Sequence, residues 1–257
     1  MIQFDRLEAL QEQFRMDFLL AKPFSYLAID DFCDTAKAMQ LYSEIPDIQT
    51  KSRDYVFAAN KFEKSKIRDI SPLFSELCDD LLSERFGKFL QYITNQPVFV
   101  DEAFHGGGIH QGKKNSFLDM HLDFNYHPMH KNWYRYLNLL LYLNKDWKPE
   151  YGGQLKLRDL RTNEETAVAV PFNRMVIQLT NNYTLHGYDI THFPEGNYRT
   201  SIASYAYSVH QHHIEKPRTT DWHVGDSGSP IKKLMAKIYD PAVKIKNKLF
   251  GSSTAKN

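Results

Sequence analysis

The fold is decided by residues 136–158, which read YLNLLLYLNKDWKPEYGGQLKLR. The first part contains the most apolar stretch of the chain, Leu137 to Leu143, and is typical of a β-strand. Asn, Asp, Pro and Gly residues follow and mark a turn. From Gln154 to Arg158, leucines alternate with polar residues, so one face of this second strand is expected to be buried and the other exposed to solvent. The stretch therefore predicts a β-rich core.

Short runs of the same kind extend over residues 97–208 and are separated by Gly, Asn and Pro turns. Many short strands with such turns predict a sandwich or jelly roll. The expected strands are Val98–Phe104, Ser116–His121, Tyr136–Leu143, Gln154–Arg158, Ala167–Val170, Met175–Leu179, Tyr183–His186 and Thr200–Ser208.

The residues before this core are predicted to be mainly helical. Apolar residues between Phe4 and Phe18 recur at spacings of three and four, which describes an amphipathic helix. A short strand over 26–29 precedes a helix over 35–43 that Asp34 would cap. Another helix starts at Pro72 and is expected to be interrupted at Gly87. We expect one domain over 1–225, with helical cladding at 1–96 and a β-core at 97–208.

Composition excludes several classes of protein. The chain has 257 residues, of which 14% are aromatic, and disordered chains lack so many apolar groups. Its formal net charge of +1 gives no global field that would attract a nucleic acid, so no dedicated nucleic-acid binding is expected. The two cysteines fit a reducing compartment. We also find no signal peptide and no apolar run of transmembrane length, and expect a cytoplasmic protein.

The C-terminal residues 226–257 form a basic tail. Seven lysines and the single acidic residue Asp240 lie between Ile231 and Asn257. A solvated terminal helix accounts for this composition. A weak contact with an anionic surface is the alternative.

One set of residues has the composition of an iron site. His121 and Asp123 are separated by one residue at the end of a predicted strand, so their side chains leave the same face. His186 follows 63 positions after Asp123, at the end of another predicted strand. Two imidazoles and one carboxylate form a facial set that leaves three positions open on a non-haem Fe(II). Arg199 and Ser201 share a face of a later strand, and a guanidinium there suits the distal carboxylate of a keto acid.

These residues resemble the Fe(II)- and 2-oxoglutarate-dependent dioxygenases, in particular the prolyl-4-hydroxylase-like branch of bacterial type. The resemblance covers about residues 20–210. It rests on His121-Leu-Asp123, His186 and Arg199-Thr-Ser201, together with Tyr142-Leu-Asn-Lys-Asp-Trp147, Gly152-Gly-Gln-Leu-Lys-Leu157, Gly106-Gly-Gly-Ile-His-Gln111 and Ile29-Asp-Asp-Phe32. The interval between His186 and Arg199 is longer than usual and is interpreted as a looped insertion around His192–Gly196.

The resemblance implies a double-stranded β-helix, a cupin-like jelly roll that is mainly β with flanking helices. It implies that His121, Asp123 and His186 bind Fe(II), and that Arg199, Tyr142 and Ser201 bind 2-oxoglutarate. The implied reaction is hydroxylation of an unactivated C–H bond with dioxygen, giving succinate and CO2, with ascorbate as a candidate stimulant. Related halogenases lack a carboxylate at the position of Asp123, so hydroxylation is favoured here.

Other polar residues have less defined roles. Gln111, Asn125, Tyr126 and Arg135 flank the motif and are candidates for contact with the substrate, for support of the site or for loop structure. The histidines at 105, 110, 127, 130 and 192 are interpreted as structural, because none of them completes a set of three ligands at strand spacing.

Two alternatives to the enzyme remain open. A cupin-like protein could bind a metal without redox turnover, and a scaffold protein could use the basic tail. Within the enzyme class, the substrate could be a peptidyl proline, a saccharide or another small molecule. The sequence does not indicate the oligomeric state, the position of hydroxylation or the role of the tail.

Overall fold

The apolar run at 137–143 forms most of β5 (Trp133–Tyr142), a central strand that is buried on both faces. Leu137, Leu139 and Leu141 belong to the large core that the helices share. Tyr142 belongs to a second core with residues of β6 (Leu155–Asp159) and β8 (Arg174–Leu179). A strand covered on both faces reads as a continuous apolar run, which explains the composition of this segment.

The computed structural model describes residues 1–48, 57–223, 234–236, 238, 239 and 243. The strands form one antiparallel sheet in the order β1-β8-β5-β10-β4-β9-β6-β7. In addition, β2 and β11 both pair with β4, and β3 pairs with β10. The remaining strands are β1 (Tyr26–Ile29), β2 (Ala58–Lys64), β3 (Val98–Val100), β4 (Gly108–Leu122), β7 (Glu165–Val168), β9 (Thr184–Tyr188), β10 (Arg199–Val209) and β11 (Asp221–Trp222).

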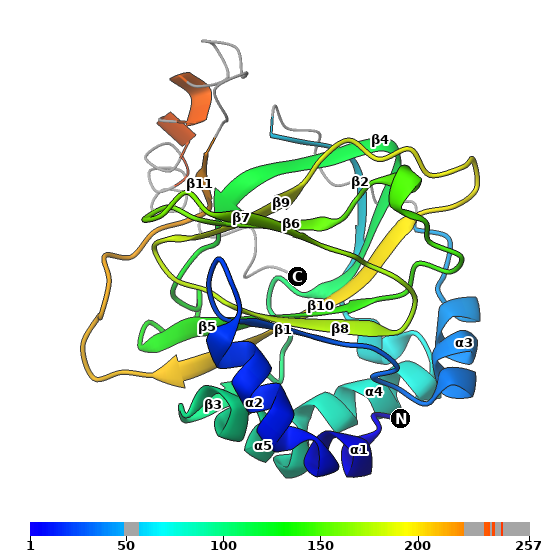
Figure 1. The fold of residues 1–257 in the computed structure, drawn as a ribbon, viewed down its shortest axis with the longest axis horizontal. Coiled ribbons are helices and arrows are strands. Elements are labelled where there is room, and N and C mark those ends of the chain that lie inside the picture. Colours follow the sequence, from blue (N-terminus) through cyan, green and yellow to red (C-terminus); the bar gives the residue numbers. More distant parts are fainter. Residues whose placement is uncertain (49–56, 224–233, 237, 240–242, 244–257) are drawn as a thin grey trace.

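Figure 1 shows that the sheet curls into a nearly closed barrel. One layer contains β2, β4, β9, β6 and β7, and the facing layer contains β1, β8, β5 and β10 (Figure 1). Helices α1, α2, α4 and α5 lie under the second layer, on its outer face (Figure 1). This arrangement confirms the predicted double-stranded β-helix with helices on one sheet.

The helices are α1 (Phe4–Ala9), α2 (Gln11–Leu20), α3 (Thr35–Ser43), α4 (Pro72–Leu82) and α5 (Glu84–Thr94). The single helix expected over 4–18 is therefore two helices, separated at Leu10. Asp34 caps α3 as predicted, by accepting the N–H of Lys37.

The interruption expected at Gly87 was wrong, because the break lies at Ser83. Ser83 has an extended backbone, and its hydroxyl accepts the N–H of Phe86. This side-chain cap starts a new helix at Glu84. Gly87 lies inside that helix, with open space where its Cβ would be.

Several strand limits also differ from the prediction. The strand expected over 98–104 ends at Val100, because the Asp101 carboxylate accepts the N–H groups of Ala103 and His105 and forms a turn. The strand expected to begin at Ser116 begins at Gly108. The predicted insertion between His186 and Arg199 is the loop 189–198 between β9 and β10.

Most of the predicted basic tail, 226–257, lies outside the described residues, so its role and the domain limit at 225 stay predictions. In the part of the chain that is described, no helix has both the length and the apolar character needed to cross a bilayer.

Candidate active site

Two neighbouring strands bring the predicted iron ligands together. His121 is the penultimate residue of β4, and its Cα pairs with that of His186 on β9. Asp123 follows directly after β4. Its Oδ1 lies 3.6 Å from Nε2 of His121, and its Oδ2 lies 3.4 Å from Nε2 of His186. Each of the three residues offers one ligand atom, and these three atoms lie within 4.8 Å of one another. The three residues can therefore hold a single metal ion.

The protonation states of these groups suit a divalent metal. Nδ1 of His121 donates to the carbonyl of Asp119 at 2.9 Å, which leaves the lone pair of the neutral ring on Nε2. Burial, together with the nearby His121, lowers the pKa of His186 to about 3, so this ring is neutral at pH 7. Burial alone would raise the pKa of Asp123, but Arg135 and the histidines hold it well below its usual range. Two imidazoles and a carboxylate fit Fe(II).

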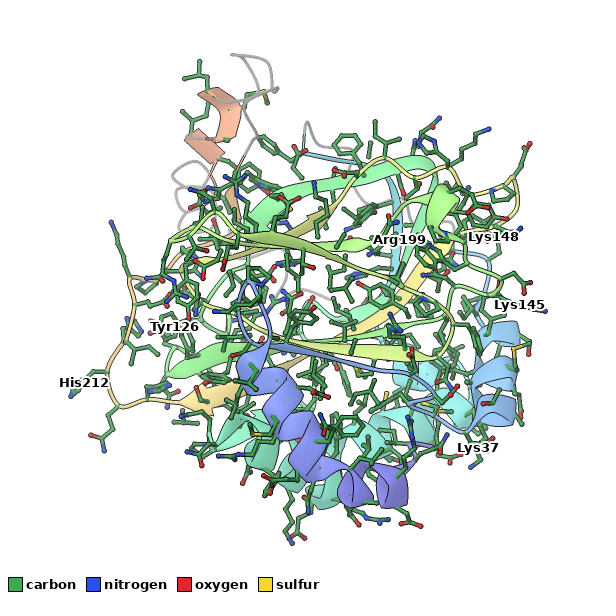
Figure 2. All side chains as sticks on the ribbon, in the orientation of Figure 1. Lys37, Tyr126, Lys145, Lys148, Arg199 and His212 are labelled. Carbon is green, nitrogen blue, oxygen red and sulfur yellow. The ribbon has the colours of Figure 1, made fainter. Side chains whose placement is uncertain are left out.

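Arg199 is the first residue of β10 and lies inside the barrel, only 6% exposed. Its Nε donates to the carbonyl of Gly153 at 2.7 Å, and its Nη2 donates to the hydroxyl of Tyr142 at 3.2 Å. Within the described part of the chain, no carboxylate forms an ion pair with Arg199. A buried guanidinium without an anion is costly, and a carboxylate ligand would neutralise its charge. Figure 2 shows Arg199 toward the opposite end of the barrel from Tyr126 and His212.

Two further residues, Tyr188 and Gly153, pack against the Arg199 side chain, and neither contact was predicted from the sequence. The guanidinium carbon of Arg199 lies 4.0 Å from the ring centre of Tyr188, which is two residues after His186 on β9. A Cβ at Gly153 would lie 3.0 Å from Cδ of Arg199, at a residue with a φ of +74°. Glycine therefore leaves the space that Arg199 occupies. The position of Tyr188 could have been predicted, because residues two apart on a strand, such as His186 and Tyr188, have their side chains on the same face.

Ser201 and Gln111 lie on opposite faces of the same sheet. Ser201 is directly paired with Tyr142 of β5 and so shares its face. Gln111 is paired with Thr200 and its amide contacts the Thr200 hydroxyl at 3.5 Å. Since neighbouring residues of a strand alternate, Gln111 faces away from Arg199, and we do not include it in the proposed site.

Asn125 and Tyr126 bind the segment that follows β10, which we call the C-terminal strap (residues 210–220; Figure 1, orange). The Asn125 amide donates to the carbonyl of Lys216 at 3.0 Å, and its Oδ1 accepts the N–H of Arg218. The Tyr126 hydroxyl accepts the N–H of Ile214 at 2.8 Å. These contacts join both residues to the strap, and contact with a substrate stays a prediction.

The strap also contacts a predicted metal ligand. Nε of Arg218 donates to the carbonyl of Asp123 at 3.0 Å. Directly after the strap, Trp222 of β11 is paired with His121, and their ring centres lie 4.8 Å apart. Neither contact could be predicted from local sequence patterns, because both join residues about one hundred positions apart.

Arg135 contacts Asp123 rather than solvent. It is 2% exposed, and its Nη2 donates to Oδ2 of Asp123 at 2.9 Å. Asn138 donates to the same oxygen at 2.9 Å. Asn138 was not identified from the sequence, although it is the polar residue that interrupts the apolar run of β5.

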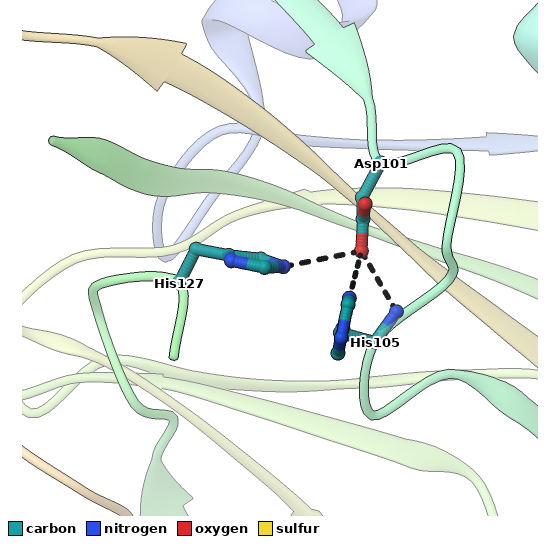
Figure 3. Close-up of side chains that lie close together, drawn as sticks. All are labelled: Asp101, His105 and His127. Carbon is teal, nitrogen blue, oxygen red and sulfur yellow. Dashed lines mark hydrogen bonds and ion pairs between the residues drawn. The ribbon is translucent and has the colours of Figure 1, made fainter. Parts of the chain in front are cut away.

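A second His/Asp cluster contains Asp101, His105 and His127 (Figure 3). Oδ2 of Asp101 accepts the backbone N–H of His105 at 2.7 Å and lies 3.2 Å from Nδ1 of His105 and 3.4 Å from Nε2 of His127. Nδ1 of His127 accepts the N–H groups of Met129 and His130. The proton of a neutral His127 ring must then be on Nε2, which blocks that atom as a metal ligand. The expectation that neither His105 nor His127 completes a set of three potential ligands was wrong, because the fold brings both rings to Asp101.

Comparisons with known proteins point to one family. Residues 107–207 match the sequence model of the 2OG-Fe(II) oxygenase superfamily. A search of curated protein sequences gave no significant match.

Solved structures show the same fold. A prolyl hydroxylase from Trichoplax adhaerens, in complex with a peptide of the hypoxia-inducible factor oxygen degradation domain, superimposes with a TM-score of 0.57 at 12% identity, covering 80% of this chain and 92% of that one. A Pseudomonas putida prolyl-4-hydroxylase gives 0.56 at 14% identity, covering 77% and 98%. HygX from Streptomyces hygroscopicus, with nickel, 2-oxoglutarate and hygromycin B bound, gives 0.51 at 16% identity, covering 72% and 82%.

The match covers β4 through most of β10, the same strands that carry the His/Asp/His cluster and Arg199 inside the barrel. On these grounds residues 107–207 match the 2OG-Fe(II) oxygenase superfamily, and the match and the His/Asp/His cluster together indicate an Fe(II)/2-oxoglutarate oxygenase.

Proposed function

We propose that this enzyme hydroxylates an unactivated C–H bond of its substrate, with His121, Asp123 and His186 holding Fe(II) and Arg199 holding 2-oxoglutarate. The bound iron would supply activation of dioxygen coupled to decarboxylation of 2-oxoglutarate to succinate and CO2. The observation that carries the proposal is the pairing of two features inside one barrel. These are a cluster of three ligands and a buried guanidinium that no described carboxylate neutralises.

The residues around Arg199 have defined tasks in this proposal. The guanidinium would bind the distal carboxylate of 2-oxoglutarate, and the Tyr142 hydroxyl, which accepts from Arg199, is free to donate its own proton to that carboxylate. Burial raises the pKa of Tyr142, so its hydroxyl keeps this proton at pH 7. Tyr188 and Gly153 fix the position of the guanidinium, by stacking under it and by leaving space for it.

The Asp123 carboxylate supports hydroxylation rather than halogenation. Its Oδ1 faces His121 and its Oδ2 is held by Arg135 and Asn138. As a ligand of Fe(II), the Asp123 carboxylate would stand where a halogenase would bind its halide ion.

The interior wall indicates a polar substrate. Lys61 and Glu63 of β2 are paired with Gly112 and His110 of β4, and these are in turn paired with Arg199 and Ser201. Directly paired residues share a face, so both charged side chains lie on the Arg199 face of the sheet. Nζ of Lys61 lies 3.6 Å from Oε1 of Glu63, and the Glu63 side chain is 46% exposed. The choice among peptidyl, saccharide and other small polar substrates is left to experiment.

The test is a substrate screen under 18O2 in the presence of Fe(II) and 2-oxoglutarate. Peptides containing proline, aminoglycosides and other polar small molecules are offered in turn. We expect one class to raise succinate formation above the uncoupled rate and to gain one oxygen atom derived from 18O2. A class that raises succinate formation without gaining oxygen would contradict hydroxylation, and would indicate another oxidation by the same centre.

A further inference from the structure

Arg135 is an arginine buried against a proposed metal ligand. Its side chain is 2% exposed, and its Nη2 donates to Oδ2 of Asp123 at 2.9 Å. Among the described residues, Asp123 is the one carboxylate with which Arg135 forms an ion pair. An isolated buried charge is costly, so the position of the guanidinium depends on this carboxylate.

Asn138 completes the contact. Its Oδ1 accepts Nε and Nη2 of Arg135 at 2.9 and 2.7 Å, which orients the amide with its Nδ2 toward Asp123. Nδ2 then donates to Oδ2 of Asp123 at 2.9 Å. Oδ2 therefore receives two strong donors, and Oδ1 receives neither.

A β-bulge makes this arrangement available. Residues three apart on a regular strand face opposite sides, yet Arg135 and Asn138 both reach Asp123. The register between β5 and β10 shifts between Ala206 and Tyr207, where Leu137 pairs with Ala206 and Arg135 pairs with Tyr207. The shift adds one residue to β5 and turns Arg135 to the side of Asn138.

Two aromatic rings fix the guanidinium. Its central carbon lies 3.4 Å from the ring centre of Tyr205 and 4.5 Å from that of Phe124. A cation between two rings is attracted to their faces and loses its freedom to reach other partners.

We propose that Arg135 and Asn138 are positioning residues that hold Asp123 through Oδ2 and so present Oδ1 alone to the metal. This rests on the proposed function, in which Asp123 is a metal ligand. A carboxylate held by one oxygen binds through the other, which keeps three coordination positions open for 2-oxoglutarate and dioxygen. Removal of the carboxylate would leave two fixed donors facing a vacated space, which is a binding site for a small carboxylate such as formate.

The first test measures Co(II) affinity by calorimetry and Co(II) coordination by visible absorption, which need no turnover. In Arg135→Met we expect a loss of affinity of about ten- to hundredfold and a changed Co(II) spectrum, as is typical when a group behind a metal ligand is removed. Arg135→Lys is expected to recover part of the affinity, because lysine keeps the charge but not the planar fork. The matched control is Arg174→Met, which removes an Arg–Asp pair with Asp30 at 2.6 Å outside the cluster, and should bind Co(II) like wild type.

The second test separates this inference from the proposed function. Asp123→Gly should bind Co(II) weakly, and formate should restore binding in Asp123→Gly but not in the double variant that also carries Arg135→Met. Loss of binding in Asp123→Gly without any effect of Arg135→Met or of formate would overturn the positioning role and leave the ligand set intact. Unchanged binding in Asp123→Gly would overturn the ligand set itself.

If Arg135→Met fails to fold, Asn138→Ala takes its place, because it removes one donor to Oδ2 without removing the charge. It should weaken Co(II) binding and shift the Co(II) spectrum in the same direction. Binding and a spectrum equal to those of wild type in a folded Asn138→Ala protein would contradict the proposal.

Discussion

Replacing Arg199 by methionine should remove 2-oxoglutarate binding while sparing the metal. Methionine keeps much of the apolar volume of the side chain but loses its charge and its donors. Removing one partner of a buried charged pair costs about 2 to 5 kcal/mol. With tenfold per 1.4 kcal/mol, this is roughly a thirtyfold to few-thousandfold loss of 2-oxoglutarate affinity. The side-chain hydrogen bonds of Arg199 go to Gly153 and Tyr142 and not to His121, Asp123 or His186, so Fe(II) affinity should be unchanged.

The stability of Arg199→Met gives an independent check. Without 2-oxoglutarate, the wild-type protein carries the buried Arg199 cation, which forms no ion pair with a carboxylate of the described residues. The variant carries no charge at this position. The variant also loses two hydrogen bonds, to Gly153 and Tyr142, so the two effects oppose each other. We expect the thermal midpoint of the ligand-free protein to change by only a few degrees. The assay is an anaerobic titration of each Fe(II)-loaded protein with 2-oxoglutarate, and equal dissociation constants, or a parallel loss of Fe(II), would refute the assignment.

Three other changes test separate parts of the site. His121→Ala should abolish metal binding and turnover, measured by calorimetry and by succinate formation, and retained stoichiometric Fe(II) would contradict the ligand set. Gly153→Ala should raise the 2-oxoglutarate KM about five- to thirtyfold, because a left-handed alanine costs about 1 to 2 kcal/mol and its Cβ meets Arg199 at 3.0 Å; a normal KM would show that Arg199 tolerates the contact. Burial raises the pKa of Asp101, but His127 and backbone N–H groups lower it from 3.8 to about 2 overall. Asp101→Asn should therefore cost about 2 kcal/mol of unfolding free energy above pH 4, with the difference vanishing as the pH falls toward 2; urea melts that show a pH-independent difference would exclude this origin.

The sequence was sufficient to predict that the proposed iron ligands and Arg199 lie on neighbouring strands of one β-core. Their spacing follows the alternation of side chains along single strands. His121 and Asp123 are two residues apart at a strand end, and His186 lies on the neighbouring strand β9, which continues two residues past the predicted end at His186. Period two and strand termination are local properties, so the printed sequence contains them. The same holds for the caps at Asp34 and Ser71, each followed three residues later by the N–H that it accepts.

Contacts that depend on register or on distant segments could not be derived in this way. Arg135 faces Asp123 only because a bulge shifts β5 against β10, and nothing in the apolar run indicates that shift. Asn125 binds the strap through residues about ninety positions away. Gly87 was favoured as a helix break because glycine has a low helix propensity, whereas the hydrogen bond made by Ser83 decided the position.

The central claim is that one barrel holds Fe(II) and 2-oxoglutarate side by side. The most direct measurement is an anaerobic titration of the wild-type protein with Fe(II) and then 2-oxoglutarate, followed by visible absorption. The account predicts a weak charge-transfer band of the chelate that saturates with 2-oxoglutarate and is weakened or lost in Arg199→Met. A folded, metal-loaded wild-type protein that gives no band would contradict it, and would favour a protein that binds metal without redox turnover.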